Sequence, residues 1–385
     1  MAFDEYDQYD ALGLAELVRT KQISAREVLD EAIRRAERLN PRLNFLTHKA
    51  YDVAQRRLET GLPNGPFEGV PWLVKELATA WEGQPYTNCS PYLKAVIAPF
   101  ESETLRRLKT AGLNPFGKTT SPEQGWALST ESELHGITCN PWDPTRTPGG
   151  SSGGAAAAVA ARVLPIAEAS DGGGSIRVPA ANCGLVGLKP ARGRISLAPA
   201  VADFWYGGAT ILGVSRSVRD TAAMLDASHG HLPGEPYQIP WPGRPWIEEV
   251  GADAGRLKIA LVAESPAGAT PVDREIQRAV YETAALLDSL GHRIEPRPLP
   301  YDYWPLVNAY AAIVAVQTAA FFDGIAGLVG HAATRTDMAT LYWTMIQKAR
   351  GITGIEHSNH VEFLRSHSRT FLGQMTAFDL WLLPT

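Results

Sequence analysis

The spacing of apolar residues near the N-terminus predicts an amphipathic helix over residues 24–39. Ser24 and Glu27 have the spacing of a capping box, which closes the first turn of a helix. The apolar residues that follow recur every three or four positions and share one face: Val28, Leu29, Ala32, Ile33, Ala36 and Leu39. Asn40-Pro41 is then expected to end the helix. The pattern predicts a helix that covers a hydrophobic core.

Short apolar runs alternate with helical patterns along the rest of the chain. A turn followed by a strand is expected at about 67–75, and further strands at 113–118, 257–263 and 292–298. Helices are expected at 103–111, from Ala155 onward, and from Thr270-Pro271 to Leu290. The first of these strands (FEGVPWLVK) ends in a lysine. This order predicts an α/β fold, with a central, mixed, twisted sheet covered by helices on both faces.

The chain is expected to form one domain over 1–385, with a helical cover at 1–60, a core at 67–220 and a C-terminal part at 257–385. Residues 230–256 are rich in Pro, Gly and Trp and predict a long surface loop. We do not expect a domain boundary there, because strands on both sides can join one sheet. The most apolar stretch, 310–322, is shorter than the roughly 20 residues that cross a bilayer. It predicts a buried helix, with an apolar wall of a binding cleft as the alternative.

Charge and cysteine content remove several classes of function. The chain has 36 basic and 41 acidic residues, a net charge of −5 and no basic run, so nucleic-acid binding is not expected. The three cysteines are far apart and lack a histidine at ligand spacing, so we predict no disulfide framework, metal site or cofactor. The acidic start (MAFDEYDQYDALG) does not resemble a signal peptide. We therefore expect a cytoplasmic protein without a membrane segment.

Two glycine–serine clusters, Gly149 to Gly154 and Asp171 to Ser175, are the first candidates for chemistry. Consecutive amides in the second cluster can point at one place, as an oxyanion hole requires, and Ser175 closes that run. A serine nucleophile needs a base, yet no histidine lies between residues 135 and 229. Lys75 is an alternative base, because burial at the end of an apolar strand favours its neutral amine. Ordinary tight turns and a surface lysine remain the simpler alternatives.

The chain resembles the amidase signature family over essentially its whole length. The stretch ending at Pro190 (PGGSSGGAAAAVAARVLPIAEASDGGGSIRVPAANCGLVGLKP) is similar to the signature itself, and 69–77 (GVPWLVKEL) is similar to the family's lysine-bearing strand. The similarity continues through GKTTSPE (117–123) and SRSVRD (215–220) and, more weakly, to the final LLPT. Two long motifs in the right order make this resemblance specific.

The resemblance implies a set of site residues. Ser175 would be the nucleophile, Ser151 the proton relay and Lys75 the base, with a cis peptide before Ser151. The implied oxyanion amides are those of Gly172, Gly173 and Gly174, and the implied supporting residues with structural roles are Ser152, Asp171 and Arg177. Gly172 stands where the family usually has a larger residue, so a looser oxyanion hole is expected.

Four other interpretations compete with this one. Residues 149–153 match the G-x-S-x-G nucleophile elbow, but no apolar strand precedes them. Residues 112–119 match the P-loop pattern, but a helix precedes them, and Pro115-Phe116 stands where backbone amides should cradle phosphates. The family also includes the amidase subunit of tRNA-dependent amidotransferase, a glutaminase within a complex. A non-catalytic relative would have lost one of the three catalytic residues.

The substrate is the least determined part of the prediction. The closest resemblance is to bacterial hydrolases of cyclic nylon dimers and to related amidases and urethanases, which implies cleavage of an amide, anilide, nylon oligomer or carbamate. Trp126 is the first candidate for substrate contact, and other aromatic residues are candidates for an apolar cleft: Trp205, Tyr206, Tyr303, Trp304, Tyr342 and Trp343. The expected partner is a small-molecule amide or carbamate, and a homodimer is left open. A further segment that covers part of the cleft is expected after residue 385.

Overall fold

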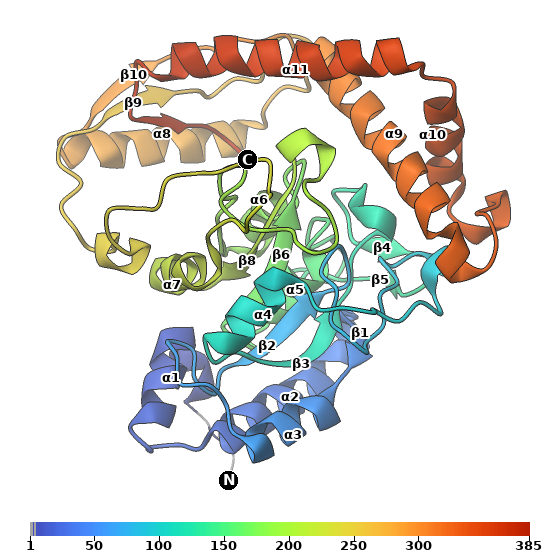
Figure 1. Cartoon of the computed structure of the whole chain (residues 1–385). Helices are drawn as coiled ribbons and strands as arrows, with labels where there is room; N and C mark the ends of the chain where they lie inside the picture. Colours follow the sequence, from blue (N-terminus) through green and yellow to red (C-terminus); the bar gives the residue numbers. More distant parts are fainter. Residues whose placement is uncertain (1–2, 4) are drawn as a thin grey trace. The chain divides into compact units, whose positions relative to one another are not determined.

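The computed structural model describes residue 3 and residues 5–385, which fall into two compact units (Figure 1). The first unit contains the described residues up to Val250 together with Ala326–Ala339, and the second contains Gly251–Ile325 and Thr340–Thr385. The division falls inside 230–256, where we expected no boundary. The prediction of a single domain over 1–385 stays a prediction, because compactness alone does not decide whether each unit folds independently. Residues 1, 2 and 4 of the acidic N-terminal segment lie outside the described residues.

The first unit begins with three helices, α1 (Ala11–Arg19), α2 (Ala25–Leu43) and α3 (Tyr51–Thr60). The capping box of α2 is confirmed, because Ser24 and Glu27 exchange side-chain to backbone hydrogen bonds. The expected stop at Asn40-Pro41 is wrong, since the helix continues to Leu43 with the proline inside it. Proline removes one helical hydrogen bond, but Leu43 is buried, so packing holds the last turn in place.

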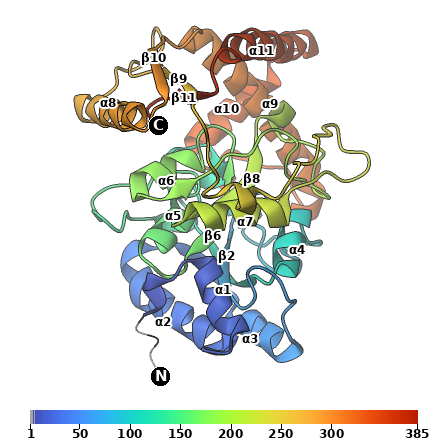
Figure 2. The ribbon, with the colours of Figure 1, turned by 90° about the vertical axis from the view of Figure 1, so that its left-hand side faces the viewer.

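Two three-stranded sheets lie in the first unit. One has the order β1-β3-β2, from β1 (Leu46–Lys49), β2 (Pro71–Lys75) and β3 (Asn114–Thr119), with β2 parallel and β1 antiparallel to β3. The other has the antiparallel order β6-β8-β7, from β6 (Ile166–Asp171), β7 (Val186–Gly187) and β8 (Thr210–Ser215). Strands β2 and β6 lie side by side, as both views show (Figure 1, Figure 2). This contact brings the two signature segments together.

The remaining elements of the first unit are α4 (Glu103–Thr110), α5 (Gly153–Ala160), α6 (Arg177–Cys183), α7 (Val218–Ser228) and the short hairpin of β4 (Glu131–Ser132) and β5 (Gly136–Ile137). Helix α5 contains only Gly, Ala and Val and packs on β2, β6 and β8. A Cβ added at Gly154 would lie 2.3 Å from the Thr120 hydroxyl oxygen. Small residues therefore let α5 approach the strands closely, and this approach positions the serines just before it.

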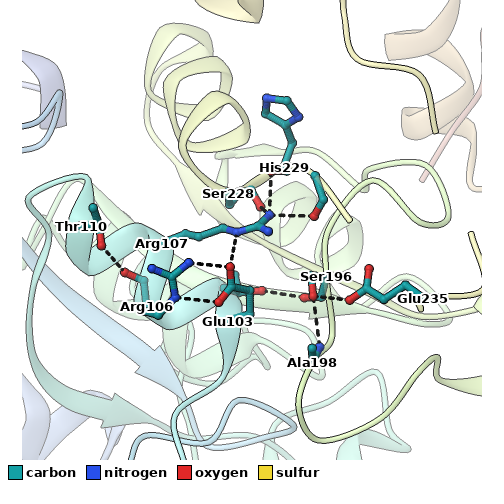
Figure 3. Close-up of polar contacts among 11 residues, drawn as sticks. Glu103, Arg106, Arg107, Thr110, Ser196, Ala198, Ser228, His229 and Glu235 are labelled. Atoms are coloured by element: carbon teal, nitrogen blue, oxygen red, sulfur yellow. Dashed lines mark hydrogen bonds and ion pairs between the residues drawn. The ribbon is translucent and has the colours of Figure 1, made fainter. Parts of the chain in front are cut away.

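A charged cluster joins α4 to the end of α7 (Figure 3). The Glu103 carboxylate accepts hydrogen bonds from the guanidinium groups of Arg106 and Arg107. Arg107 Nη1 also donates to the backbone carbonyls of residues 228–230, at 2.7 to 3.0 Å. The last carbonyls of a helix have no partner within it, so this guanidinium caps α7 and ties it to α4.

The second unit contains a parallel sheet of order β10-β9-β11, from β9 (Lys258–Leu261), β10 (Arg293–Pro296) and β11 (Leu380–Leu382). Its helices are α8 (Arg274–Ser289), α9 (Tyr303–Val329, whose end belongs to the first unit), α10 (Thr340–Arg350) and α11 (Gly354–Met375). Helix α8 is capped by Asp273, which accepts from the Glu275 amide, and not by the expected Thr270-Pro271. A carboxylate at the N-cap satisfies the first amides, so the helix starts later than predicted.

The apolar stretch 310–322 lies within α9, which is longer than expected. At 27 residues, α9 is long and apolar enough to cross a membrane by length and composition, so the expected helix was too short. One third of its most apolar window, 33%, is buried in the structure. Because the core helices of globular proteins pass the same test, this is weak evidence for a span. The absence of a membrane partner stays a prediction.

Candidate active site

Lys75 ends β2 and is fully buried among hydroxyl groups. Its Nζ donates to Ser151 Oγ and Ser152 Oγ, each at 2.8 Å, and to Ser170 Oγ at 3.0 Å. An ammonium can donate three hydrogen bonds, whereas a neutral amine donates two and accepts one. Three hydroxyls around one nitrogen therefore suit both forms, since a hydroxyl can rotate and donate its own proton. The alternative of a surface lysine is excluded by this burial.

Burial lowers the pKa of Lys75 from 10.5 to about 7, although the carboxylates of Asp171 and Glu168 favour its charged form. Glu168, also fully buried, accepts from the Lys75 amide at 2.9 Å and from Thr79 Oγ1 at 2.7 Å. Burial raises the pKa of Glu168 to about 7, despite these hydrogen bonds. Near neutral pH, a large fraction of Lys75 is therefore the neutral amine, which can accept a proton.

The loop that carries Ser151 and Ser152 precedes α5 and is held tightly. Thr130 Oγ1 donates to the Gly149 carbonyl at 2.8 Å and accepts from the Gly153 amide at 3.1 Å, so one buried hydroxyl clamps both ends of the loop. A Cβ added at Gly150 would lie 2.6 Å from two backbone carbonyl oxygens. The peptide before Ser151 is cis, as expected. Ser151 is 1% exposed, so the loop has little freedom.

The second glycine cluster turns around Asp171, at the end of β6. The Asp171 carboxylate accepts from the amides of Gly174 (2.8 Å) and Ile176 (3.1 Å) and from the Arg177 guanidinium (two bonds of 2.9 Å). Burial would raise the pKa of Asp171, but the Arg177 contacts and the amides outweigh it and hold that pKa below its usual range. These contacts shape the turn, in line with the structural roles expected for Asp171 and Arg177.

The structure corrects the expected set of oxyanion amides. The Gly174 amide donates to Asp171 and is therefore already used within the turn. Among the described residues, no protein acceptor is assigned to the amides of Gly173 and Ser175. A Cβ at Gly172 would lie 2.1 Å from the ring of Trp205, which occupies the space of the larger residue, and the looser hole expected there stays a prediction.

The structure contains the Lys75–Ser151 hydrogen bond of the expected proton relay. Lys75 and Ser151 are joined as predicted, but among the described residues no hydrogen bond joins Ser151 Oγ to Ser175 Oγ. Hydrogen bonds between catalytic groups are often long in the absence of substrate, so the Ser151–Ser175 hydrogen bond stays a prediction. Trp126 follows Gly125, where an added Cβ would lie 3.2 Å from Ser151 Oγ. The backbone of Gly125 is thus close to Ser151, and the contact of Trp126 with substrate stays a prediction.

The remaining aromatic candidates divide between the units. Trp205 and Tyr206 belong to the first unit, whereas Tyr303, Trp304, Tyr342 and Trp343 belong to the second. Of the second group, Trp304 is 55% exposed and Tyr342 is buried. Their role as walls of a cleft stays a prediction.

Sequence reasoning missed three polar residues of this site: Ser170, Glu168 and Thr130. Ser170 and Glu168 lie on β6 beside Asp171, where alternate positions share a face, so strand periodicity offered a signal for both. Thr130 lies outside either cluster and carried no signal.

The structure does not support the P-loop match or the nucleophile-elbow match. Residues 114–119 of the P-loop match form the buried strand β3, so their amides belong to a sheet. No strand directly precedes Ser151, so the nucleophile-elbow geometry is missing from this described segment. In the part of the chain that the structure describes, no group of three or more His, Cys, Asp or Glu residues is arranged to hold a metal ion.

The buried Lys75 is hydrogen-bonded to Ser151, Ser152 and Ser170, and the second glycine cluster ends in Ser175. The Amidase family model matches residues 27–385, and the chain belongs to the amidase signature family, a family of hydrolases. This confirms the resemblance, and the α/β fold class is confirmed by the structural matches below.

The chain is 36% identical to the 6-aminohexanoate-cyclic-dimer hydrolase of Paenarthrobacter ureafaciens, over 98% of this chain and 77% of that protein. Among solved structures, 6-aminohexanoate cyclic dimer hydrolase matches with a TM-score of 0.91 and 35% identity, covering 97% of this chain and 78% of the other. A bacterial aryl acylamidase of the amidase signature family matches with a TM-score of 0.90 and 30% identity, covering 98% and 79%. Amide hydrolases are thus similar to this chain over nearly its whole length.

Proposed function

We propose that this amidase cleaves amide-type C–N bonds through an acyl-enzyme on Ser175, with Ser151 as proton relay and Lys75 as base. The observation that carries the proposal is the 2.8 Å hydrogen bond between the buried Lys75 Nζ and Ser151 Oγ. A buried amine with a pKa of about 7 is a competent base at neutral pH, whereas an exposed lysine is almost entirely protonated.

The reaction proceeds in two balanced halves. Ser175 Oγ attacks the carbonyl carbon while its proton passes to Ser151, whose own proton passes to Lys75. The proton then returns along the same path to the leaving nitrogen, so the C–N bond breaks and a neutral amine departs. Water then attacks the carbonyl carbon of the remaining ester and gives a proton to the relay. The bond between this carbon and Ser175 Oγ breaks, the relay returns the proton to Ser175 Oγ, and the acid is released. The amides of Gly173 and Ser175 are the proposed donors to the negative oxygen, and Gly172 contributes by backbone shape.

The proposed substrate is a cyclic or linear oligomer of an aminoalkanoic acid, or an aryl amide. The similarity to the cyclic-dimer hydrolase and to the aryl acylamidase supports these two classes. Carbamates have the same reacting carbonyl, so urethane cleavage is proposed as a secondary activity. We further propose that the enzyme works in the cytoplasm without a nucleic-acid partner or a cofactor.

Adjacent serines provide a matched test of the relay. Ser151 and Ser152 lie at the same distance from Lys75 Nζ, and each loses one hydroxyl on change to alanine. We expect Ser151→Ala to lower kcat by about 10² to 10⁴-fold, the usual contribution of proton transfer, and Ser152→Ala to lower it much less. Ser175→Ala should abolish turnover, and Lys75→Ala should be nearly as severe. Equal losses in the two neighbouring variants would contradict the assignment of the relay.

Covalent labelling and a substrate panel test the nucleophile and the reaction class. A fluorophosphonate should add to Ser175, as mapped by peptide mass spectrometry, and Ser175→Ala should abolish the label. Label on Ser151 would reverse the two roles. The panel contains 6-aminohexanoate cyclic dimer, an aryl anilide, a carbamate and glutamine. Hydrolysis of glutamine alone would instead favour the amidase subunit of a tRNA-dependent amidotransferase.

A further inference from the structure

The indole ring of Trp205 lies directly against the backbone of Gly172, the first residue of the glycine run. A Cβ added at Gly172 would be 2.1 Å from Cζ3 and 2.6 Å from Cε3 of that ring, far inside van der Waals contact. Any side chain at 172 would have to displace the indole. Glycine at 172 and tryptophan at 205 are therefore a complementary pair, in which an aromatic ring occupies the space that a side chain at 172 would take.

The backbone that presents Trp205 has an unusual conformation. Trp205 and Tyr206 have φ angles of 53° and 54°, in the left-handed region that bulky residues rarely adopt. Gly207 follows with a φ of 77°, and the Arg192 side chain packs within 2.3 Å of where its Cβ would be. Two consecutive aromatic residues in this region persist only when the surroundings hold them there, and such conformations concentrate at functional sites.

The space beside this ring is open. A Cβ added at Gly173 would meet no atom within 4 Å, and this residue is exposed, whereas Gly172 and Trp205 are half-buried. Beyond it, a Cβ at Gly174 would lie 3.9 Å from Leu128, a leucine that is 53% exposed. Along the glycine run before Ser175, a side chain would thus meet the indole of Trp205 at 172, open space at 173, and Val178 (3.0 Å) before Leu128 at 174.

We infer that Trp205 is a specificity-determining residue whose ring forms one wall of the substrate site over the backbone of Gly172 and Gly173. A flat, rigid ring against Gly172, three residues before the reacting serine, admits acyl groups that are unbranched or planar next to the scissile carbonyl, such as methylene chains and aryl rings. It excludes acyl groups branched at that carbon. The inference rests on the proposed function, because it takes Ser175 as the site of acylation.

The test compares two isomeric substrates, hexanoyl para-nitroanilide and its α-branched isomer, diethylacetyl para-nitroanilide. The wild-type enzyme should prefer the straight chain, and Trp205→Ala should reduce the ratio of the two kcat/KM values by about tenfold or more, the discrimination that a hydrophobic wall usually provides. Trp205→Phe keeps a flat ring and should retain most of the preference. Trp241→Ala makes the same chemical change at a tryptophan that is 64% exposed and should leave the ratio unchanged.

A second pair of variants tests the packing itself. Gly172→Ala should lower kcat/KM for both substrates, because its Cβ displaces the indole, and adding Trp205→Ala should restore part of the activity with the straight chain. Trp205→Leu replaces Trp205→Ala if circular dichroism shows that the alanine variant does not fold. An unchanged preference in a folded Trp205 variant that still takes the fluorophosphonate on Ser175 would overturn the inference. Label absent from Ser175 in the wild-type enzyme would overturn the proposed function instead.

Discussion

If Lys75 is the base, the rate of acylation should follow the neutral fraction of a lysine whose pKa has been lowered by burial. At pH 7, about half of a lysine with a pKa of about 7 is neutral, against roughly one in 3,000 at the ordinary value of 10.5. Burial therefore increases the proton-accepting form by about three orders of magnitude. The base form grows as pH rises, so kcat/KM should increase through about pH 7 and then level off. Initial rates on an uncharged anilide between about pH 5 and pH 10 measure this profile.

Glu168→Gln provides the matched perturbation for this profile. The Glu168 carboxylate favours the charged form of Lys75, so its replacement by a neutral amide of similar shape should move the rising limb to lower pH. The rising limb of the wild-type pH profile reports the titration of Lys75 and Glu168 together, because burial brings the pKa of Glu168 to about 7 as well. A midpoint near pH 10 would contradict a buried Lys75 as the base, and a rising limb that Glu168→Gln leaves in place would contradict its coupling to Glu168.

Three further predictions concern the supporting structure. Gly154→Ala places a Cβ 2.3 Å from its nearest neighbour and should cost about 1–3 kcal/mol, seen by calorimetry as a lower Tm; Gly173→Ala, where a Cβ meets nothing within 4 Å, is the control. Thr130→Val leaves both ends of the glycine loop without their shared hydroxyl, so kcat and Tm should both fall. Thr130→Ser should restore both values. Unchanged kinetics in Thr130→Val would show that this hydroxyl does not hold the loop. Ser170→Ala removes one hydrogen-bond acceptor from the Lys75 ammonium, so the rising limb of the pH profile should shift to lower pH. The loss of rate should be smaller than for Ser151→Ala. A loss as large as that of Ser151→Ala would make Ser170 the relay.

Contacts between distant segments explain what the sequence-based expectations missed. Asn40-Pro41 is a strong local stop signal, but burial of Leu43 extends the helix past it. The Gly174 amide looked available until the turn placed it on Asp171. The gap at Gly172 is filled by a ring 33 positions later in the chain, whose approach depends on a left-handed turn that local propensity disfavours. None of these outcomes is encoded in the few residues around the position concerned.

The amino-acid sequence is sufficient to predict the family and the candidate catalytic residues, whereas the surroundings of those residues depend on the folded chain. A strand ending in lysine and two glycine-rich turns are local patterns that made Lys75, Ser151 and Ser175 candidates, and the resemblance to the family supplied the roles proposed for them. The lowered pKa of Lys75, the third hydroxyl from Ser170 and the indole wall at Gly172 depend on β2, α5, β6 and the Trp205 turn meeting in space. Desolvation and van der Waals contact act over a few ångströms and ignore sequence separation, so only the folded chain specifies them.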